Sequence, residues 1–135
     1  MGDDGLSELQ ERVRRFADER DWGQFHTPKN LTMALAGEVG ELIEHFQWLT
    51  PAQSGEVMAD PGTARAVEDE LADVLIYLVR LADVLGVDLL DAARAKLAEN
   101  AKRYPADQAR GSAAKAPRPG RAGPFPEVVK GEGGQ

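Results

Sequence analysis

Large apolar side chains recur every three or four residues through most of the first hundred positions, which is the spacing of amphipathic helices. The four apolar stripes cover residues 6–16, 31–49, 67–85 and 89–97. Ser7, Asn30 and Asp88 are the expected N-caps. Gly86 and Pro105 are expected to end the third and fourth helices. The pattern therefore predicts four helices with short connections.

No segment shows the alternation of apolar and polar residues that is typical of a β-strand. Residues 50–61 are expected to form a loop or one short turn between the second and third helices. The predicted fold class is all-α, with the four helices packed as a bundle. Leu75 and Ile76 lie off the main stripe of the third helix, so its apolar surface is broader than a single bundle needs. We therefore expect the chain to form oligomers.

The composition changes after Tyr104 and divides the chain into two parts. Residues 105–135 contain five prolines and six glycines, and this tail is expected to be mostly disordered because it has few apolar side chains to bury. Residues 1–104 form the expected all-α domain, in which 20 acidic residues oppose 11 basic ones. The chain of 135 residues has a net charge of −7, which argues against nucleic acid as its main partner.

Neither a membrane protein nor a cysteine-based site is expected. The longest apolar run, residues 74–79, is much shorter than the roughly 18 residues that a membrane span needs. The acidic N-terminus does not resemble a targeting peptide. The absence of cysteine excludes disulfides, thiolate metal sites and cysteine nucleophiles. We expect a cytoplasmic protein with no membrane partner.

Two pairs of carboxylates occupy inward positions on the second and third helices. On a helical wheel, Glu38 falls inside the apolar stripe and Glu41 lies at its edge. Glu70 and Asp73 occupy the same places on the third helix. Buried carboxylates are costly unless they are paired or bound to a cation. Neither helix has a basic residue at a matching inward position, since Arg65 and Arg80 lie off the stripe. The pattern favours a metal site over two exposed acidic helix edges.

The donor types favour a hard divalent cation. Carboxylate oxygens suit Mg²⁺, with Mn²⁺ as the alternative ion. A di-iron site needs Glu-x-x-His motifs, whereas His45 follows Glu41 by four residues and the third helix has no histidine. Magnesium held by carboxylates commonly also contacts substrate phosphates, so these residues point to a phosphorylated substrate.

The connection between the first two helices is rich in aromatic side chains. Residues 22–30 include Trp22, Phe25 and His26. This segment either folds back over the bundle as a plug or forms the wall of a flat aromatic pocket. Beside a metal site for phosphates, the second interpretation indicates a nucleotide whose base stacks on tryptophan.

At these residues the sequence resembles the MazG-like all-α nucleoside triphosphate pyrophosphohydrolases. Their motif is Glu-x-x-Glu, a spacer and Glu-x-x-Asp, and here it spans residues 38–41 and 70–73. The sequence is similar to the dCTP pyrophosphatase branch of that family over roughly residues 6–105. The similarity is carried by four blocks, residues 19–30, 37–48, 69–82 and 95–105.

The resemblance implies hydrolysis of dCTP to dCMP and pyrophosphate, which removes surplus or non-canonical deoxynucleotides. It implies that Mg²⁺ is bound by the four carboxylates Glu38, Glu41, Glu70 and Asp73. Glu41 and Asp73 are the preferred candidates for the general base, because a stripe edge lets them reach a water beyond the metal. The implied substrate-binding residues are Trp22, Phe25, His26, Trp48, Tyr77, Lys96 and Asn100. The resemblance also implies a homotetramer built as a dimer of dimers, with active sites between subunits.

Two other functions remain open from the sequence. The same chemistry on another triphosphate, such as dUTP or a modified nucleotide, would use the same residues and is separated by a panel of substrates. A non-catalytic helical interaction module would use the bundle only as a scaffold. The four inward carboxylates argue against the module, because a scaffold gains no stability from buried acids.

Overall fold

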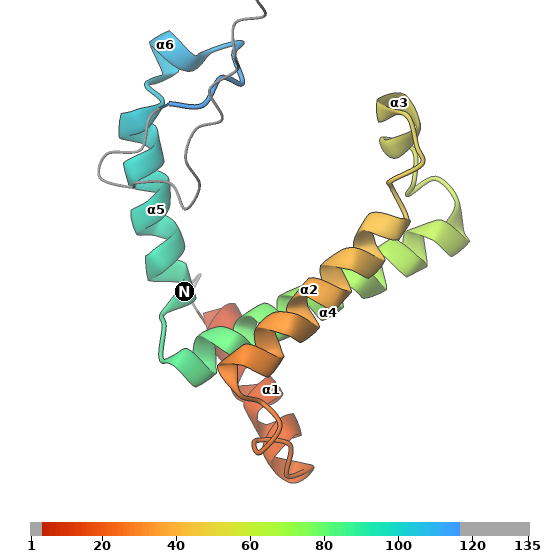
Figure 1. The fold of residues 1–135 in the computed structure, drawn as a ribbon, viewed down its shortest axis with the longest axis vertical. Helices are drawn as coiled ribbons and strands as arrows, with labels where there is room; N and C mark the ends of the chain where they lie inside the picture. The colour runs from red at the N-terminus through yellow and green to blue at the C-terminus, as the bar shows by residue number, and fades with distance from the viewer. Residues whose placement is uncertain (1–3, 117–135) are drawn as a thin grey trace, which may run out of the picture. The chain divides into compact units, whose positions relative to one another are not determined.

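The computed structural model describes residues 4–116. Its helices, shown in Figure 1, are α1 (Asp4–Glu19), α2 (Pro28–Glu44), α3 (Pro51–Ser54), α4 (Pro61–Leu85), α5 (Leu89–Arg103) and α6 (Ala106–Ala109). No β-strand occurs within residues 4–116, so the predicted all-α class is confirmed. The chain divides into two compact units, Met1–Arg94 and Ala95–Gln135, and the division falls inside α5.

In the first unit, α4 is the helix against which the others pack. Figure 1 shows α2 running beside α4 in the opposite direction, and α1 also contacts α4. The buried apolar residues come from these three helices and are Ala17, Leu31, Val67, Val79 and Ala82. The core of this unit therefore lies where α1, α2 and α4 meet.

Two of the expected helix starts are wrong. The N-cap of α2 is Thr27, whose hydroxyl oxygen accepts a hydrogen bond from the backbone N–H of Asn30 at 3.2 Å. Pro28 then takes the first helical position, where its missing N–H costs nothing. Ser7 is not an N-cap, because α1 already begins at Asp4 and Ser7 lies inside the helix.

The expected boundaries at Gly86, Asp88 and Pro105 agree with the structure. The second helix, however, ends at Glu44, although its apolar stripe continues to residue 49. Gly86 ends α4 with φ 69°, a left-handed conformation that glycine adopts without the steric cost of a Cβ atom. The carboxylate of Asp88 accepts a hydrogen bond from the backbone N–H of Asp91 at 2.9 Å at the start of α5. The expected short turn between the second and third predicted helices is α3.

The second unit is described as far as residue 116. It contains the end of α5 and the single turn α6, which lies inside the segment expected to be disordered. Arg103 donates a hydrogen bond to the carbonyl of Ala116 at 2.8 Å, and the backbone N–H of Ala116 donates to the hydroxyl of Tyr104 at 3.0 Å. The expectation for residues 117–135 lies outside the described residues, and the domain boundary at 104 stays a prediction.

Helix α4 keeps large apolar side chains at the surface of this single chain. Leu71 and Leu85, which the helical stripe placed in the core, are 52% and 55% exposed. The reason is that α1 and α2 cover only part of a broad apolar surface. Over residues 4–116, no helix is long and apolar enough to cross a membrane.

Candidate metal and nucleotide site

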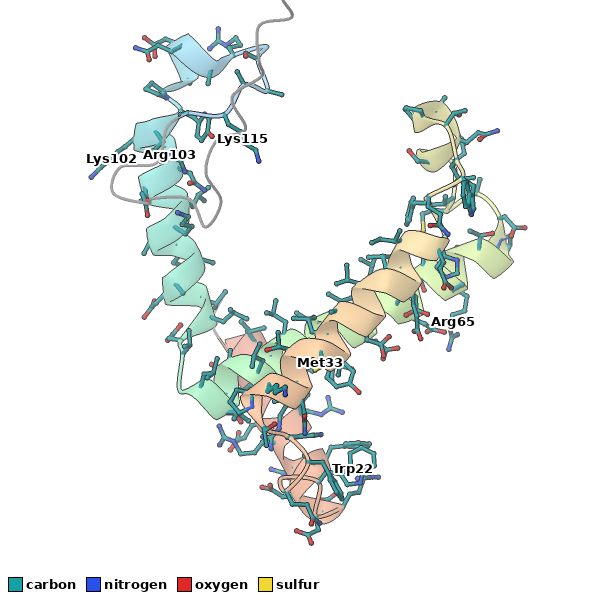
Figure 2. All side chains as sticks on the ribbon, viewed as in Figure 1. Trp22, Met33, Arg65, Lys102, Arg103 and Lys115 are labelled. Carbon is teal, nitrogen blue, oxygen red and sulfur yellow. The ribbon has the colours of Figure 1, made fainter. Side chains whose placement is uncertain are left out.

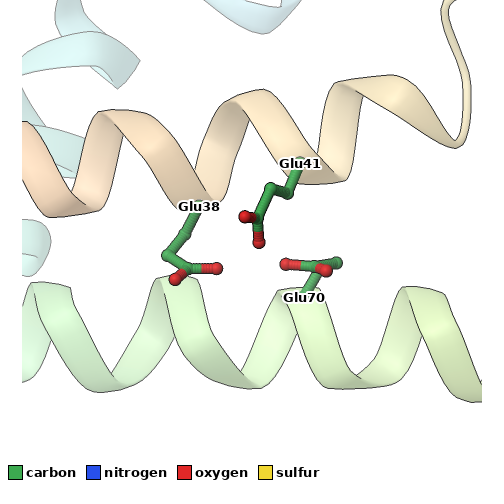
Figure 3. A group of neighbouring side chains, drawn as sticks. All are labelled: Glu38, Glu41 and Glu70. Carbon is green, nitrogen blue, oxygen red and sulfur yellow. The ribbon is translucent and has the colours of Figure 1, made fainter.

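Three of the four predicted metal ligands converge between α2 and α4. Figure 3 shows Glu38 and Glu41 projecting from α2 toward Glu70 on α4. One carboxylate oxygen from each residue lies within 4.8 Å of the others. The three-residue spacing puts Glu38 and Glu41 on one face of α2, and the packing of α2 along α4 brings Glu70 opposite them.

This carboxylate cluster lacks a counter-charge among the described residues. One oxygen of Glu38 and one of Glu70 are buried and accept no hydrogen bond there. Burial, reinforced by the neighbouring Glu41, raises the pKa of Glu38 to about 7. Burial and the charge of Glu41 also raise the pKa of Glu70. Buried oxygen donors without a proton donor fit a hard divalent cation such as Mg²⁺.

Asp73 lies one turn beyond Glu70 on α4 and is not part of the 4.8 Å group. Its charge nevertheless contributes to the raised pKa values of Glu38 and Glu70. Asp73 is half-buried, and so is Tyr77 one turn further along the same helix. Their roles as metal ligand and base contact stay predictions.

The aromatic connection forms a structured loop between α1 and α2. Its backbone is tied down where the N–H of Trp22 donates to the carbonyl of Ala17 at 2.9 Å. The ring of Trp22, labelled in Figure 2, meets the rings of Phe16 and His26 edge to face, with centroid distances of 5.6 and 6.3 Å. Trp22 is 43% exposed and Phe25 is 59% exposed. Such exposure favours the pocket wall over the buried plug.

The two tryptophans expected at the base lie at opposite ends of α2. Trp22 precedes the helix, and Trp48 follows it with 86% of its surface exposed. A helix of 17 residues is about 25 Å long. One chain therefore cannot place both rings against the same base.

The predicted phosphate contacts belong to the second unit. Lys96 and Asn100 lie one turn apart on α5. The ammonium of Lys96 is exposed and lies 3.4 Å from a carboxylate oxygen of Glu99. Contact of Lys96 and Asn100 with a substrate stays a prediction.

A buried arginine beside the aromatic loop is the residue that the sequence reasoning missed. Arg80 was expected off the apolar stripe, yet only 8% of its surface is exposed. It donates hydrogen bonds to Nδ1 of His26 at 3.0 Å and to Asp83 at 3.3 Å. Arg14 of α1 donates to the same Asp83 carboxylate at 2.8 Å. The apolar stripe marks only the side of α4 that faces α2. Arg80 lies on another side, which α1 and the aromatic loop cover.

Comparison with known proteins identifies the family of this chain. A model of the MazG-like family matches residues 34–116, a range that contains all four predicted metal ligands. The chain belongs to the MazG-like family. The membership confirms the family resemblance found in the Glu-x-x-Glu and Glu-x-x-Asp motifs.

Individual proteins are also similar over most of the chain. The dCTP pyrophosphatase 1 proteins of Rattus norvegicus and Homo sapiens are both 49% identical over 110 residues. These matches cover 82% of this chain but 65% of each relative, so the chain spans just under two-thirds of their length. The crystal structure of a pyrophosphatase from Archaeoglobus fulgidus superposes with a TM-score of 0.70 and 40% identity, over 75% of this chain and 93% of that one.

Proposed function

We propose that this chain is a Mg²⁺-dependent pyrophosphohydrolase that converts dCTP and water to dCMP and pyrophosphate in the cytoplasm. The observation that carries the proposal is the convergence of Glu38, Glu41 and Glu70 within 4.8 Å, with buried oxygens that accept no hydrogen bond among the described residues. The similarity to proteins named dCTP pyrophosphatase 1 supports dCTP as the substrate.

The carboxylates of α2 and α4 would hold the metal, with Mn²⁺ as the alternative ion. Glu38, Glu41 and Glu70 would bind it directly, and Asp73 would complete the set from the next turn of α4. A bound divalent ion would neutralise negative charge on the triphosphate during hydrolysis. Without such a cation, the negative charge of these acids would repel an approaching triphosphate.

Hydrolysis at the α-phosphorus needs a base for the attacking water. The oxygen of water bonds to the α-phosphorus, the bond from that phosphorus to the bridging oxygen breaks, and pyrophosphate leaves. The proton of the water passes to a carboxylate. Glu41 is the exposed member of the carboxylate cluster and Asp73 lies one turn beyond Glu70 on α4, so these two residues are the candidates for the base.

The position of the aromatic residues supports an active site shared by two copies of the chain. Trp48 and the carboxylate cluster lie toward the C-terminal end of α2, whereas Trp22 and His26 precede its N-terminal end. A second copy in antiparallel contact would bring its Trp22 loop to the Trp48 and metal end of the first. The exposed apolar side chains Leu71 and Leu75 on α4 provide surface for such a contact. We infer a homotetramer built as a dimer of dimers.

Product analysis with dCTP and Mg²⁺ tests the proposed activity. We expect dCMP and pyrophosphate in equal amounts, measured by nucleotide chromatography and a pyrophosphate assay. Glu41→Gln and Asp73→Asn should each lower kcat by at least about a hundredfold, because a ligand or base is lost. Glu68→Gln is the matched control, since Glu68 is an exposed acid of α4 outside the carboxylate cluster.

Other products or substrates would change the conclusion in defined ways. Release of dCDP and phosphate would contradict attack at the α-phosphorus. Turnover of dUTP or a modified nucleotide in preference to dCTP would keep the chemistry and change the substrate. No turnover of any triphosphate, together with no thermal stabilisation by Mg²⁺ and nucleotide, would favour the non-catalytic module.

A further inference from the structure

The aromatic loop is held to α4 by a chain of charged hydrogen bonds that the metal site does not use. Arg80 is buried, and its Nε–H donates to Nδ1 of His26 at 3.0 Å. The carboxylate of Asp83 accepts hydrogen bonds from Arg80 and from Arg14. The Arg14 hydrogen bond is the main reason that the pKa of Asp83 lies below its usual range, so Asp83 stays charged and holds the buried guanidinium in place.

The hydrogen bond from Arg80 determines where His26 carries its proton. A guanidinium group can only donate hydrogen bonds, so Nδ1 of His26 must accept with its lone pair. The imidazole is then neutral and its proton sits on Nε2. Burial and the positive charge of Arg80 both lower the pKa of His26, which agrees with a neutral ring. The remaining nitrogen is therefore a hydrogen-bond donor, and no described residue accepts from it.

We propose that Arg80 is a positioning residue that holds His26 as an Nε2–H donor toward the unprotonated N3 atom of cytosine. The proposal rests on the proposed function, in which the aromatic loop binds the base. Cytosine carries a lone pair on N3, whereas uracil and thymine carry a hydrogen there. A fixed donor therefore matches cytosine and opposes uracil, because two donors would face each other.

Nitrogen-15 NMR of the imidazole rings tests the tautomer directly. The chain has only two histidines, and His45 at the end of α2 provides an internal reference. In the wild-type protein we expect a protonated Nε2 and an unprotonated Nδ1 for His26. Arg80→Met should give a mixture of tautomers and a higher pKa for His26, since the donor and the charge are both removed.

Arg14→Met is the matched control for the tautomer experiment. It removes both hydrogen bonds from Arg14 to Asp83, which belong to the same network, without removing the contact to His26. We expect its His26 spectrum to match wild type even where its melting temperature is lowered. A tautomer change in Arg14→Met as large as that in Arg80→Met would overturn the direct role of Arg80.

Kinetics with dCTP and dUTP test whether the tautomer of His26 affects the preference for one substrate over the other. Arg80→Met should raise KM for dCTP about three- to tenfold, the usual worth of one hydrogen bond, with kcat changed less than about twofold. KM for dUTP should change less, so the difference in KM between dCTP and dUTP becomes smaller. In a His26→Ala background, Arg80→Met should have no further effect on KM, because the group that it positions is gone.

The possible failures are distinguishable. A wild-type His26 with its proton on Nδ1 overturns the proposal by itself, even if Arg80→Met does not fold. Equal rises in KM for dCTP and dUTP overturn the assignment to N3. A protein with the expected tautomer that hydrolyses neither nucleotide would instead contradict the proposed function.

Discussion

Glu38 and Glu70 are the residues on which the metal site depends, since each has one carboxylate oxygen shielded from solvent and accepting no hydrogen bond among the described residues. Their inward positions were predictable because the apolar stripes of both helices include them. The distance of Asp73 from the other three carboxylates was not predictable. A helical wheel gives the direction of each side chain around one helix, but it does not give the distance to side chains of another helix.

The raised pKa of Glu38 predicts that the metal-free protein loses stability as pH rises. At about 7, this pKa lies above the ordinary value of 4.5, so between these values the folded chain holds a proton that the unfolded chain has released. The free energy of unfolding therefore falls across this window. Glu38→Gln should raise the melting temperature in EDTA at pH 8 and change it little at pH 5, as measured by calorimetry.

The same variant should separate stability from metal binding. Mg²⁺ at pH 8 should raise the melting temperature of the wild-type protein and of Glu68→Gln, but much less that of Glu38→Gln. Equal stabilisation of all three proteins would show that Glu38 does not bind the ion.

At the scale of helices, the end of α4 was predictable and the start of α2 was not. Gly86 follows the last apolar residue of its stripe, and few other residues fit a left-handed helix end. Before α2, both Thr27 and Asn30 are good N-caps, and a stripe beginning at Leu31 favoured the later one. Pro28 favours Thr27 as the N-cap, because the proline ring suits the first position of a helix and its missing N–H is not needed there.

The left-handed backbone at Gly86 predicts opposite effects for two glycine-to-alanine changes. Gly86→Ala should lower the free energy of unfolding by about 1–2 kcal/mol, because a Cβ is strained at φ 69°. Gly37→Ala, inside α2 with open space around the new methyl group, should raise it by about 0.5–1 kcal/mol. Urea denaturation in EDTA measures both, and a stabilising Gly86→Ala would contradict the left-handed assignment.

At the scale of the whole molecule, the single chain leaves much apolar surface unburied. Met33 is 64% exposed and Ile43 is 50% exposed on α2, while Leu71 and Leu75 are 52% and 41% exposed on α4. Sequence periodicity indicated that α4 has apolar residues on more than one side. It did not indicate which of them the chain covers by itself, since that depends on how α1 and α2 pack on α4.

Charging this surface should disrupt the proposed assembly. Leu75→Lys should shift the protein to a smaller species in sedimentation velocity and lower its activity with dCTP, because the base pocket would lose residues of the second copy. Glu68→Lys introduces the same side chain at an exposed polar position and should leave both measurements unchanged. Full activity of a monomeric Leu75→Lys variant would contradict the shared site.

The sequence by itself determined the helical fold class, the inward direction of Glu38 and Glu70, and membership of the family, because each depends on local spacing along the chain. Tertiary structure alone decided that Arg80 is buried and bonded to His26, 54 positions earlier in the chain. It also decided that Trp22 and Trp48 lie too far apart to share a base within one chain. The apolar periodicity indicates which face of one helix is buried. The position of Arg80 and the separation of the two tryptophans depend instead on which elements pack against the other faces.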